Sequence, residues 1–474
     1  MSALKRNLLY QTLYQILVIA LPLATAPYIS RVLGAEKFGI FSYSNVVATY
    51  FVVVGMLGLE QYGNRCISRV RDNYEERSSV FSELITLHAL ISVIVIMIYV
   101  LYVAFLVDEF RDVFVIQGIY VLSLFFDVNW FFFGMEKYKL TVIRNTIIKV
   151  SSVLSVFLFV KNRDDLNLYC LIIVLSIFFS QISLWPLLKK YVKYKKVQWN
   201  KLYKHMRPMI ILFIAVIAAN LNRMIDKVML GWYGCFSDLG QFDYADKLVR
   251  VPLSFIAALG TVMLSKMSYM YVKANKAKTD EILDTSAFSI LVVSIGMAFI
   301  IAAVSPEFVV WFLGDEFTGS SVLLCILTIT IPLVAWDNFV RTQILIPKQL
   351  DYIYTSAVCS GAIVNIIANI FLIYYFGAKG AAISSVISYF VIMTLQTYPV
   401  LKLINLKQYM YDARYHVICG VVTFLIVRAC SVIFENVTIS LFVQTIVGFI
   451  IYGLLSYMYI KKKRFQLLQI VFKK

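Results

Sequence analysis

The stretch ELITLHALISVIVIMIYVLYVAFL, residues 83–106, decides the fold class of this chain. The 23 residues that follow its glutamate include no Asp, Glu, Lys or Arg. An α-helix needs about 20 predominantly apolar residues to cross the hydrocarbon core of a bilayer. The stretch therefore predicts a transmembrane helix.

Similar apolar stretches recur along the whole chain. Hydrophobic residues make up 61% of the sequence and the mean hydropathy is +0.79, which excludes an ordinary soluble domain. The gaps between the stretches are short, so we predict an all-α, polytopic membrane protein with about fourteen spans. These spans are residues 9–30, 39–63, 83–106, 112–134, 140–160, 166–188, 208–230, 242–265, 282–305, 318–340, 352–375, 379–401, 414–434 and 437–460.

Lysine and arginine residues lie mostly in the two terminal tails and in every second gap between spans. The gap from Lys189 to Arg207 alone holds eight of the 44 cations. An excess of Lys and Arg in short flanking loops marks the cytoplasmic side of a membrane protein. Both termini are therefore predicted to be cytoplasmic. The net charge of +17 is dispersed over these loops, which favours contact with anionic lipid over nucleic-acid binding.

Two junctions between spans resemble each other. RVLG (residues 31–34) and FGIFSYSNVV (38–47) follow the first span, whereas VMLG (228–231) and LGQFDYADKLV (239–249) follow the seventh. Six spans separate the copies, so both copies have the same orientation. Parallel repeats place a substrate site at their interface. We predict two six-helix lobes, residues 1–195 and 200–402, followed by a helix pair with a basic cytoplasmic tail, residues 413–474.

Several segments carry a family resemblance in their order and spacing. They are PYISRVLGAEKFGIFSYS (27–44), RCISRVRDNYEERSSVFSE (65–83), NRMIDKVMLG (222–231), FLGDEF (312–317), RTQILIP (341–347) and GAIVNIIANIFLIYYFGAKGAAISSVIS (361–388). The chain resembles the bacterial polysaccharide flippases of the multidrug/oligosaccharidyl-lipid/polysaccharide exporter superfamily.

The resemblance implies a V-shaped bundle in the bacterial cytoplasmic membrane. It implies a protein that moves polyprenyl-diphosphate-linked oligosaccharide from the inner to the outer leaflet for surface-polysaccharide assembly. We expect a monomer that contacts membrane lipids and is able to associate with polysaccharide polymerase machinery. No cofactor is expected, and the coupling ion, Na⁺ or H⁺, stays open.

A flippase for this cargo needs cations that bind a diphosphate inside the membrane, where unpaired charge is costly. In the seventh span, Asn220, Arg223 and Lys227 follow i, i+3, i+7 spacing and share one helix face. Lys247 and Arg250 lie three residues apart in the eighth span. Arg223 and Lys247 are the first candidates for substrate contact, followed by Arg31, Lys227 and Arg250.

Two cations of the candidate set lie in other spans. Arg31 ends the first span, where a snorkelling interfacial arginine is the alternative. Lys149 lies well inside the fifth span.

Acidic residues near these cations leave a structural interpretation open. Asp226 lies three residues after Arg223, and Asp246 lies four residues before Arg250. Ion pairs that hold spans seven and eight together are therefore the alternative to substrate binding.

Three lone ionisable residues, His88, Asp127 and Asp337, are candidates for carrying a coupling proton. Interhelical hydrogen bonding is the alternative for each of them. The aromatic run from Trp130 to Phe133 is interpreted as an interfacial belt.

The sequence offers no signature of an enzyme. The three histidines lie in separate regions, and no phosphate-binding glycine-rich loop is present, so neither a metal site nor direct use of ATP is expected. A membrane glycan polymerase or ligase is a distant alternative, because the predicted outer loops are short. An Na⁺- or H⁺-coupled multidrug exporter and a peptidoglycan lipid-precursor flippase are closer alternatives. The surplus of cations over acids near the repeat junctions favours an anionic cargo.

Overall fold

The computed structural model describes residues 3–272, 276–434 and 436–463 of the 474-residue chain. Side chains in these ranges are described except those of residues 3–19, 201, 215, 219, 222, 223, 265, 272, 276, 277 and 463. Every regular element in the described ranges is a helix. The all-α fold class is therefore confirmed.

Eleven helical segments of the described chain are long and apolar enough to cross a membrane. Two of them, Ala20–Val70 and Asp351–Val400, comprise 51 and 50 residues. Each of the two is more than twice the length that one crossing requires. The polytopic character is confirmed, whereas the number fourteen stays a prediction.

Both of these long segments contain a break at a glycine. Gly34 interrupts α1 (Ala3–Met56) with φ 73° and ψ 177°, and Gly377 interrupts α14 (Asp351–Thr397) with φ 54° and ψ −133°. Side chains of L-residues disfavour positive φ, whereas glycine adopts it readily. Each break falls in a gap that the sequence places between two consecutive spans.

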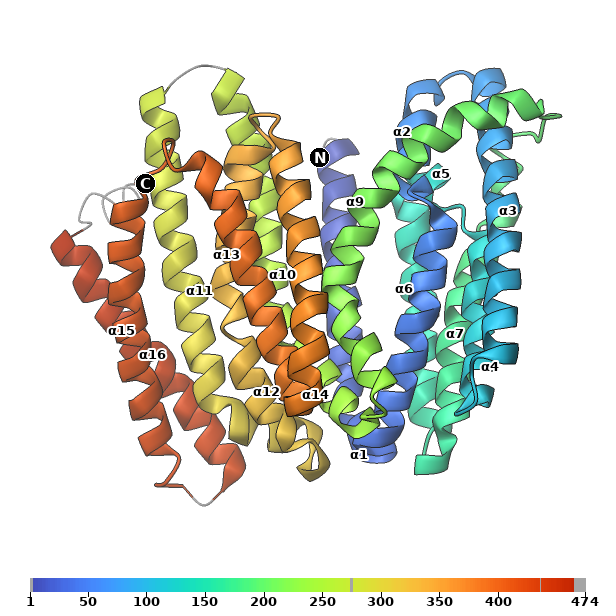
Figure 1. The fold of residues 1–474 in the computed structure, drawn as a ribbon. Helices are drawn as coiled ribbons and strands as arrows, with labels where there is room; N and C mark the ends of the chain where they lie inside the picture. The colour runs from blue at the N-terminus through green and yellow to red at the C-terminus, as the bar shows by residue number, and fades with distance from the viewer. Residues whose placement is uncertain (1–2, 273–275, 435, 464–474) are drawn as a thin grey trace. The chain divides into compact units, whose positions relative to one another are not determined.

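The chain divides into two compact units, Met1–Gly231 and Trp232–Lys474. The predicted boundaries of the lobes and of the C-terminal pair stay predictions. After α1, the helices of the first unit are α2 (Leu59–Val70), α3 (Tyr74–Phe105), α4 (Arg111–Ser123), η1 (Leu124–Phe126), α5 (Asn129–Gly134), α6 (Tyr138–Phe159), η2 (Arg163–Asp165), α7 (Leu166–Ile182), α8 (Trp185–Leu188) and α9 (Trp199–Trp232) (Figure 1).

The second unit begins at Trp232, the last residue of α9. Its helices, with α14 at its place in the order, are α10 (Phe236–Val272), α11 (Lys276–Leu313), η3 (Asp315–Phe317), α12 (Gly319–Leu327), α13 (Thr330–Val340), the π-helix η4 (Arg341–Leu345), η5 (Tyr398–Val400), α15 (Leu406–Cys430) and α16 (Val437–Lys463).

The aromatic run in α5 lies in the core of the first unit. Trp130, Phe131 and Phe132 are completely buried, and the ring of Phe81 from α3 lies 5.8 Å from the ring of Trp130. Trp130 Nε1 also donates a hydrogen bond to the backbone oxygen of Asp127, at 3.1 Å. The interpretation as an interfacial belt is wrong for these three residues, because their rings pack in one core cluster with residues of α2 and α3.

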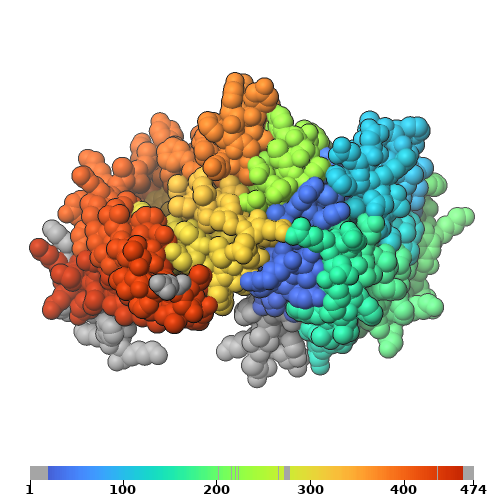
Figure 2. Space-filling view, turned by 90° about the horizontal axis from the view of Figure 1, so that it is seen from below, coloured from blue at the N-terminus to red at the C-terminus, as the bar shows by residue number. Residues whose placement is uncertain are grey.

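Helices α15 and α16 pack against α11 in the second unit. Arg428 of α15 binds both carboxylate oxygens of Glu307 on α11, at 2.7 and 2.9 Å. Tyr452 of α16 donates a hydrogen bond to the backbone oxygen of Val292, at 2.8 Å. Figure 1 shows the red and orange-red pair alongside the yellow α11, and Figure 2 shows the pair from its lower end. An interhelical ion pair therefore joins α15 to α11, and a hydrogen bond joins α16 to it.

Candidate functional site

Two ion pairs lie on helix α10 of the second unit. Lys247 Nζ lies 2.9 Å from Asp243 Oδ2. Arg250 binds Asp246 through Nε and Nη2, each at 3.0 Å from one carboxylate oxygen. In both pairs the acidic residue precedes the cation by four positions, which is the favourable order on a helix. The sequence suggested the second pair, whereas Asp243 was missed although the same spacing marks it.

The two cations of α10 are more accessible than their acidic partners. The side chains of Lys247 and Arg250 are 40% and 38% exposed, whereas those of Asp243 and Asp246 are 4% and 15% exposed. The less exposed carboxylates thus lie beneath cationic groups that are partly exposed. The ring of Tyr244 lies 5.3 Å from Lys247 Nζ and adds an aromatic surface beside it.

Both pairs connect residues of one helix. Such i, i+4 pairs support their own helix by a few tenths of a kcal/mol and do not by themselves join it to a neighbour. This geometry weakens the alternative that Asp246 and Arg250 serve to hold two spans together.

The candidates on α9 belong to the first unit. Asn220 donates through Nδ2 to the backbone oxygen of Val216 at 2.9 Å, so its amide bonds within its own helix. Asp226 and Lys227 are buried, at 3% and 8% exposure. The side chain of Arg223 lies outside the described residues, so the predicted three-residue face of this helix stays a prediction. Because Lys227 is buried, it is less accessible to a ligand than Lys247.

Arg31 lies one turn before the break at Gly34. Its side chain is exposed, and Nη1 donates to the backbone oxygen of Pro27 at 2.8 Å. The guanidinium group thus lies at the end of the first helical half of α1, where the snorkelling alternative stays open.

A polar network joins the end of η1, α5 and α7 inside the first unit. Asp127 accepts hydrogen bonds from the backbone nitrogen and Nδ2 of Asn129, both at 2.9 Å, and from Nε2 of Gln181 at 3.0 Å. Asn129 Nδ2 also lies 2.8 Å from Gln181 Oε1. Three amide donors therefore surround the Asp127 carboxylate, as a half-buried carboxylate requires.

Arg144 of α6 extends this network and was missed by sequence reasoning. Its Nη2 donates to Asn129 Oδ1 at 3.1 Å and to Asn145 Oδ1 at 2.5 Å. Its Nη1 donates to the backbone oxygen of Ser180. A cation in an apolar span was the available signal. Lys149 follows Asn145 by one turn on the same helix and is half-buried.

His88 of α3 is completely buried. Its Nε2 lies 2.8 Å from the backbone oxygen of Leu124. A carbonyl oxygen only accepts, so this nitrogen carries the proton. The contact joins α3 to η1, as the hydrogen-bonding alternative anticipated, and a role in coupling stays a prediction.

Asp337 lies on α13 of the second unit, one turn before Arg341. Among the described residues, its buried Oδ1 has no hydrogen-bond partner. Arg341 begins the π-helix η4, and its guanidinium carbon lies 5.3 Å from the centre of the Tyr354 ring. Short π-helical turns occur frequently at functional sites. Arg341 is the second intramembrane cation that sequence reasoning did not select.

No group of three or more His, Cys, Asp or Glu residues suited to a metal ion occurs in the described part of the chain. The candidate chemistry therefore consists of cations, carboxylates and amides.

Comparison with known proteins gives this arrangement a context. A family model described as polysaccharide biosynthesis protein matches residues 4–270. A proposed O-antigen transporter of Shigella dysenteriae is 24% identical over 388 residues, which cover 80% of this chain and 96% of that protein. A proposed low-salt glycan biosynthesis flippase of Haloferax volcanii is 21% identical over 242 residues, half of each chain.

Two solved structures share the fold. The lipid II flippase MurJ in an inward closed conformation has a TM-score of 0.77 at 14% identity, covering 96% of this chain and 99% of that chain. An inward-facing multidrug resistance transporter of the MOP superfamily has a TM-score of 0.63 at 12% identity, covering 85% and 99%. Because the family model covers more than half of its residues, the chain belongs to the polysaccharide biosynthesis protein family and has the fold of the MOP-superfamily transporters.

Proposed function

We propose that this protein is a flippase that moves a polyprenyl-diphosphate-linked oligosaccharide repeat unit from the inner to the outer leaflet of the bacterial cytoplasmic membrane. Family membership and the names of the O-antigen and glycan relatives support a transporter for surface-polysaccharide assembly rather than an enzyme.

The observation that carries the proposal is the accessible cationic pair on α10. The cargo brings about two negative charges and a hydrophilic glycan into a medium that solvates neither. Lys247 and Arg250 are about two-fifths exposed and lie within one turn of each other. Asp243 and Asp246 balance their charge, so the pair offers cationic hydrogen-bond donors, rather than net positive charge, to a diphosphate.

The guanidinium group of Arg250 still has donors for a phosphate. Arginine has five N–H groups, and Asp246 occupies one at Nε and one at Nη2. The other three are able to donate to phosphate oxygens while Asp246 holds the group in place. Charge-assisted hydrogen bonds of this kind are among the stronger ones in proteins.

The mechanism that we propose is alternating access by two lobes. Arg31, Arg144 and Lys149 would supply positive charge from the first unit, and Asp127, His88 and Asp337 are the candidates for coupling protons. An inside-negative potential of about 100 mV favours outward movement of each negative charge by about 2.3 kcal/mol. If the diphosphate crosses uncompensated, the membrane potential itself drives transport.

The test is a translocation assay in proteoliposomes that contain a fluorescent polyprenyl-diphosphate oligosaccharide. Lys247→Ala and Arg250→Ala are each expected to slow flipping about tenfold or more, because each removes one charged contact worth about 1.5–3 kcal/mol. Lys266→Ala is the matched control, since Lys266 is an exposed lysine on the same helix. Equal rates in all three variants would reject the α10 cations as a substrate site.

The same vesicles separate the alternative cargoes. A cationic drug dye and a peptidoglycan lipid precursor are tested beside the oligosaccharide lipid. Transport of the dye alone would identify a multidrug exporter, and transport of the precursor alone would identify a peptidoglycan flippase.

A further inference from the structure

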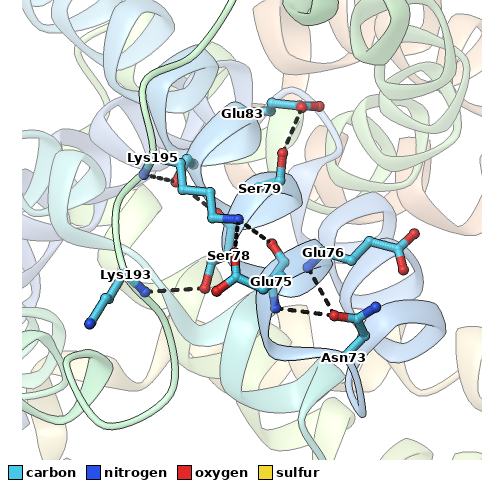
Figure 3. A network of polar contacts seen from close by, with 9 residues as sticks. Asn73, Glu75, Glu76, Ser78, Ser79, Glu83, Lys193 and Lys195 are labelled. Atoms are coloured by element: carbon cyan, nitrogen blue, oxygen red, sulfur yellow. Dashed lines mark hydrogen bonds and ion pairs between the residues drawn. The ribbon is translucent and has the colours of Figure 1, made fainter.

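The segment that connects α8 to α9 is bound along helix α3 (Figure 3). Ser78 Oγ accepts from the backbone nitrogen of Lys193 at 3.2 Å, and Ser82 Oγ accepts from that of Lys195 at 2.8 Å. Lys195 also forms an ion pair with Glu75. Residues 192–198 have no regular secondary structure. The contacts of Lys193 and Lys195, two residues apart, fix the segment against the first half of α3.

A hollow of about 530 Å³ lies between α3 on one side and α8 with the start of this segment on the other. One wall is a stripe on α3 that includes Ile85, Ala89 and Val93, and the other wall includes Trp185 and Val192. A second hollow of about 330 Å³ adjoins it, because both are lined by Thr86 and Tyr194, whose hydroxyl oxygens lie 3.0 Å apart. We call the two hollows together the α3 groove.

The α3 groove continues into an exposed apolar face of the same helix. Leu90, Val93, Ile94, Met97 and Ile98 are between 41% and 54% exposed. In a helix whose composition suits a membrane span, this face borders the acyl chains. A chain lying in the groove would thus extend directly towards the bilayer interior.

Lysines and exposed aromatic rings also line the α3 groove. Lys189 and Lys196 line it, and both are exposed. The stretch KKYVKYKKVQWN, residues 189–200, contains five lysines and no acidic residue. Tyr194 and Trp199 are 66% and 70% exposed, which suits side chains at the level of lipid headgroups.

We propose that the α3 groove binds one anionic phospholipid of the cytoplasmic leaflet. One acyl chain occupies the apolar hollow, and the phosphate lies against Lys189 and Lys196. The bound lipid covers the apolar wall and holds the connection between α8 and α9 at the membrane surface. This site is separate from the α10 cations and does not depend on the identity of the transported cargo.

The test uses the full-length protein purified from the membrane and reconstituted with phosphatidylglycerol or phosphatidylcholine. Native mass spectrometry counts the lipid that stays bound. The wild type is expected to retain phosphatidylglycerol about tenfold or more over phosphatidylcholine, from two lysines near the headgroup. Lys189→Gln with Lys196→Gln is expected to remove this preference, and Ala89→Trp is expected to reduce retention of both lipids by filling the hollow.

The matched control is Lys402→Gln with Lys407→Gln, two exposed lysines on the same predicted side of the membrane. It is expected to keep the wild-type preference. An unchanged preference in the Lys189/Lys196 variant would overturn the proposal, as would an equal loss in the control. Displacement of phosphatidylglycerol by an equal concentration of polyprenyl diphosphate would assign the groove to the cargo instead. Flipping rates are measured on the same variants. Failure of the lipid site then shows in the lipid count, whereas failure of the proposed function shows in the flipping rate of the wild type.

Discussion

The two copies of the repeated segment have nearly the same burial and a different charge. Residues 41–49 of α1 and 242–250 of α10 match in burial class at seven of nine positions. The two exceptions are Tyr43, which is more exposed than Tyr244, and Val46, which is buried where Lys247 is not. A common packing pattern thus supports a duplicated helix.

The charges occur in only one of these copies. Asp243, Asp246, Lys247 and Arg250 of α10 correspond to Ser42, Asn45, Val46 and Thr49 of α1. Thr49 donates to the backbone oxygen of Asn45 at 2.7 Å, a neutral counterpart of the pair between Arg250 and Asp246. The same helix position is therefore stable without any charge. The charges of α10 are therefore not needed for packing of the helix. This favours a function of these residues in binding the cargo.

The largest effect is expected when α10 receives the residues of the first copy. A variant with Asp243→Ser, Asp246→Asn, Lys247→Val and Arg250→Thr should fold, because α1 shows that these residues suit the same burial. Its flipping rate is expected to fall about a hundredfold or more, since two charged contacts are lost together. Size-exclusion profiles and vesicle transport measure the two properties. A variant that folds and transports normally would remove the functional meaning of the charges.

The ion pair between Arg428 and Glu307 connects two helices, so its loss should reduce stability, whereas loss of the α10 charges should reduce transport. Arg428→Met leaves the carboxylate of Glu307, which is only 16% exposed, without its arginine. We expect a loss of about 1–3 kcal/mol in unfolding free energy, less than for a fully buried pair. Thermal unfolding in detergent measures it. The double variant with Glu307→Leu should recover most of the loss, and no recovery would contradict this account.

Glycine is needed for different reasons at corresponding positions of the two copies. Gly34 has a positive φ, whereas its counterpart Gly231 would place a Cβ only 2.1 Å from the ring of Tyr43. Gly34→Ala is expected to cost about 1–2 kcal/mol through the backbone, and Gly231→Ala about 1–3 kcal/mol through overpacking. Tyr43→Ala should partly rescue only Gly231→Ala. Equal rescue of both in thermal unfolding would disprove the distinction.

Much of the architecture could be predicted because it depends on local patterns. Apolar length places the spans, glycine marks the breaks at 34 and 377, and i, i+4 spacing indicates the pair between Asp246 and Arg250. The contacts of Asp127 with Gln181, and of Arg144 with Ser180, join residues 36 to 54 positions apart. No local period encodes such contacts. Burial of Trp130 was missed for the same reason, since belts and cores use the same aromatic residues.

The smallest effect concerns a second interhelical carboxylate, Glu83 of the first unit. His205 Nε2 lies 3.0 Å from Glu83 Oε2, and Tyr62 Oη lies 2.8 Å from His205 Nδ1. Burial lowers the pKa of His205 from its ordinary value, and the hydrogen bond with Glu83 offsets this only in part. The unfolded chain therefore binds the proton more readily than the folded one.

Stability contributed by His205 should thus be complete above a pH of about 6.5 and decline as the pH falls below it. Arg428, which holds Glu307, does not titrate in this range. Unfolding temperatures recorded between pH 5 and pH 8 check the contrast. His205→Gln should flatten the profile, while the double variant Arg428→Met, Glu307→Leu, which removes both groups of the other pair, should leave its shape unchanged. A profile that His205→Gln does not alter would refute the role of the histidine.

The most direct test of the central claim compares two cargoes in one assay. A glycolipid with a diphosphate head and one with an uncharged head are measured in vesicles that contain the wild type or the Lys247→Val, Arg250→Thr variant. We expect the flipping rate of the diphosphate lipid to exceed that of the uncharged lipid strongly in the wild type. In the variant we expect the ratio of the two rates to be close to one. An unchanged preference in the folded variant would contradict the claim that α10 recognises the phosphate head.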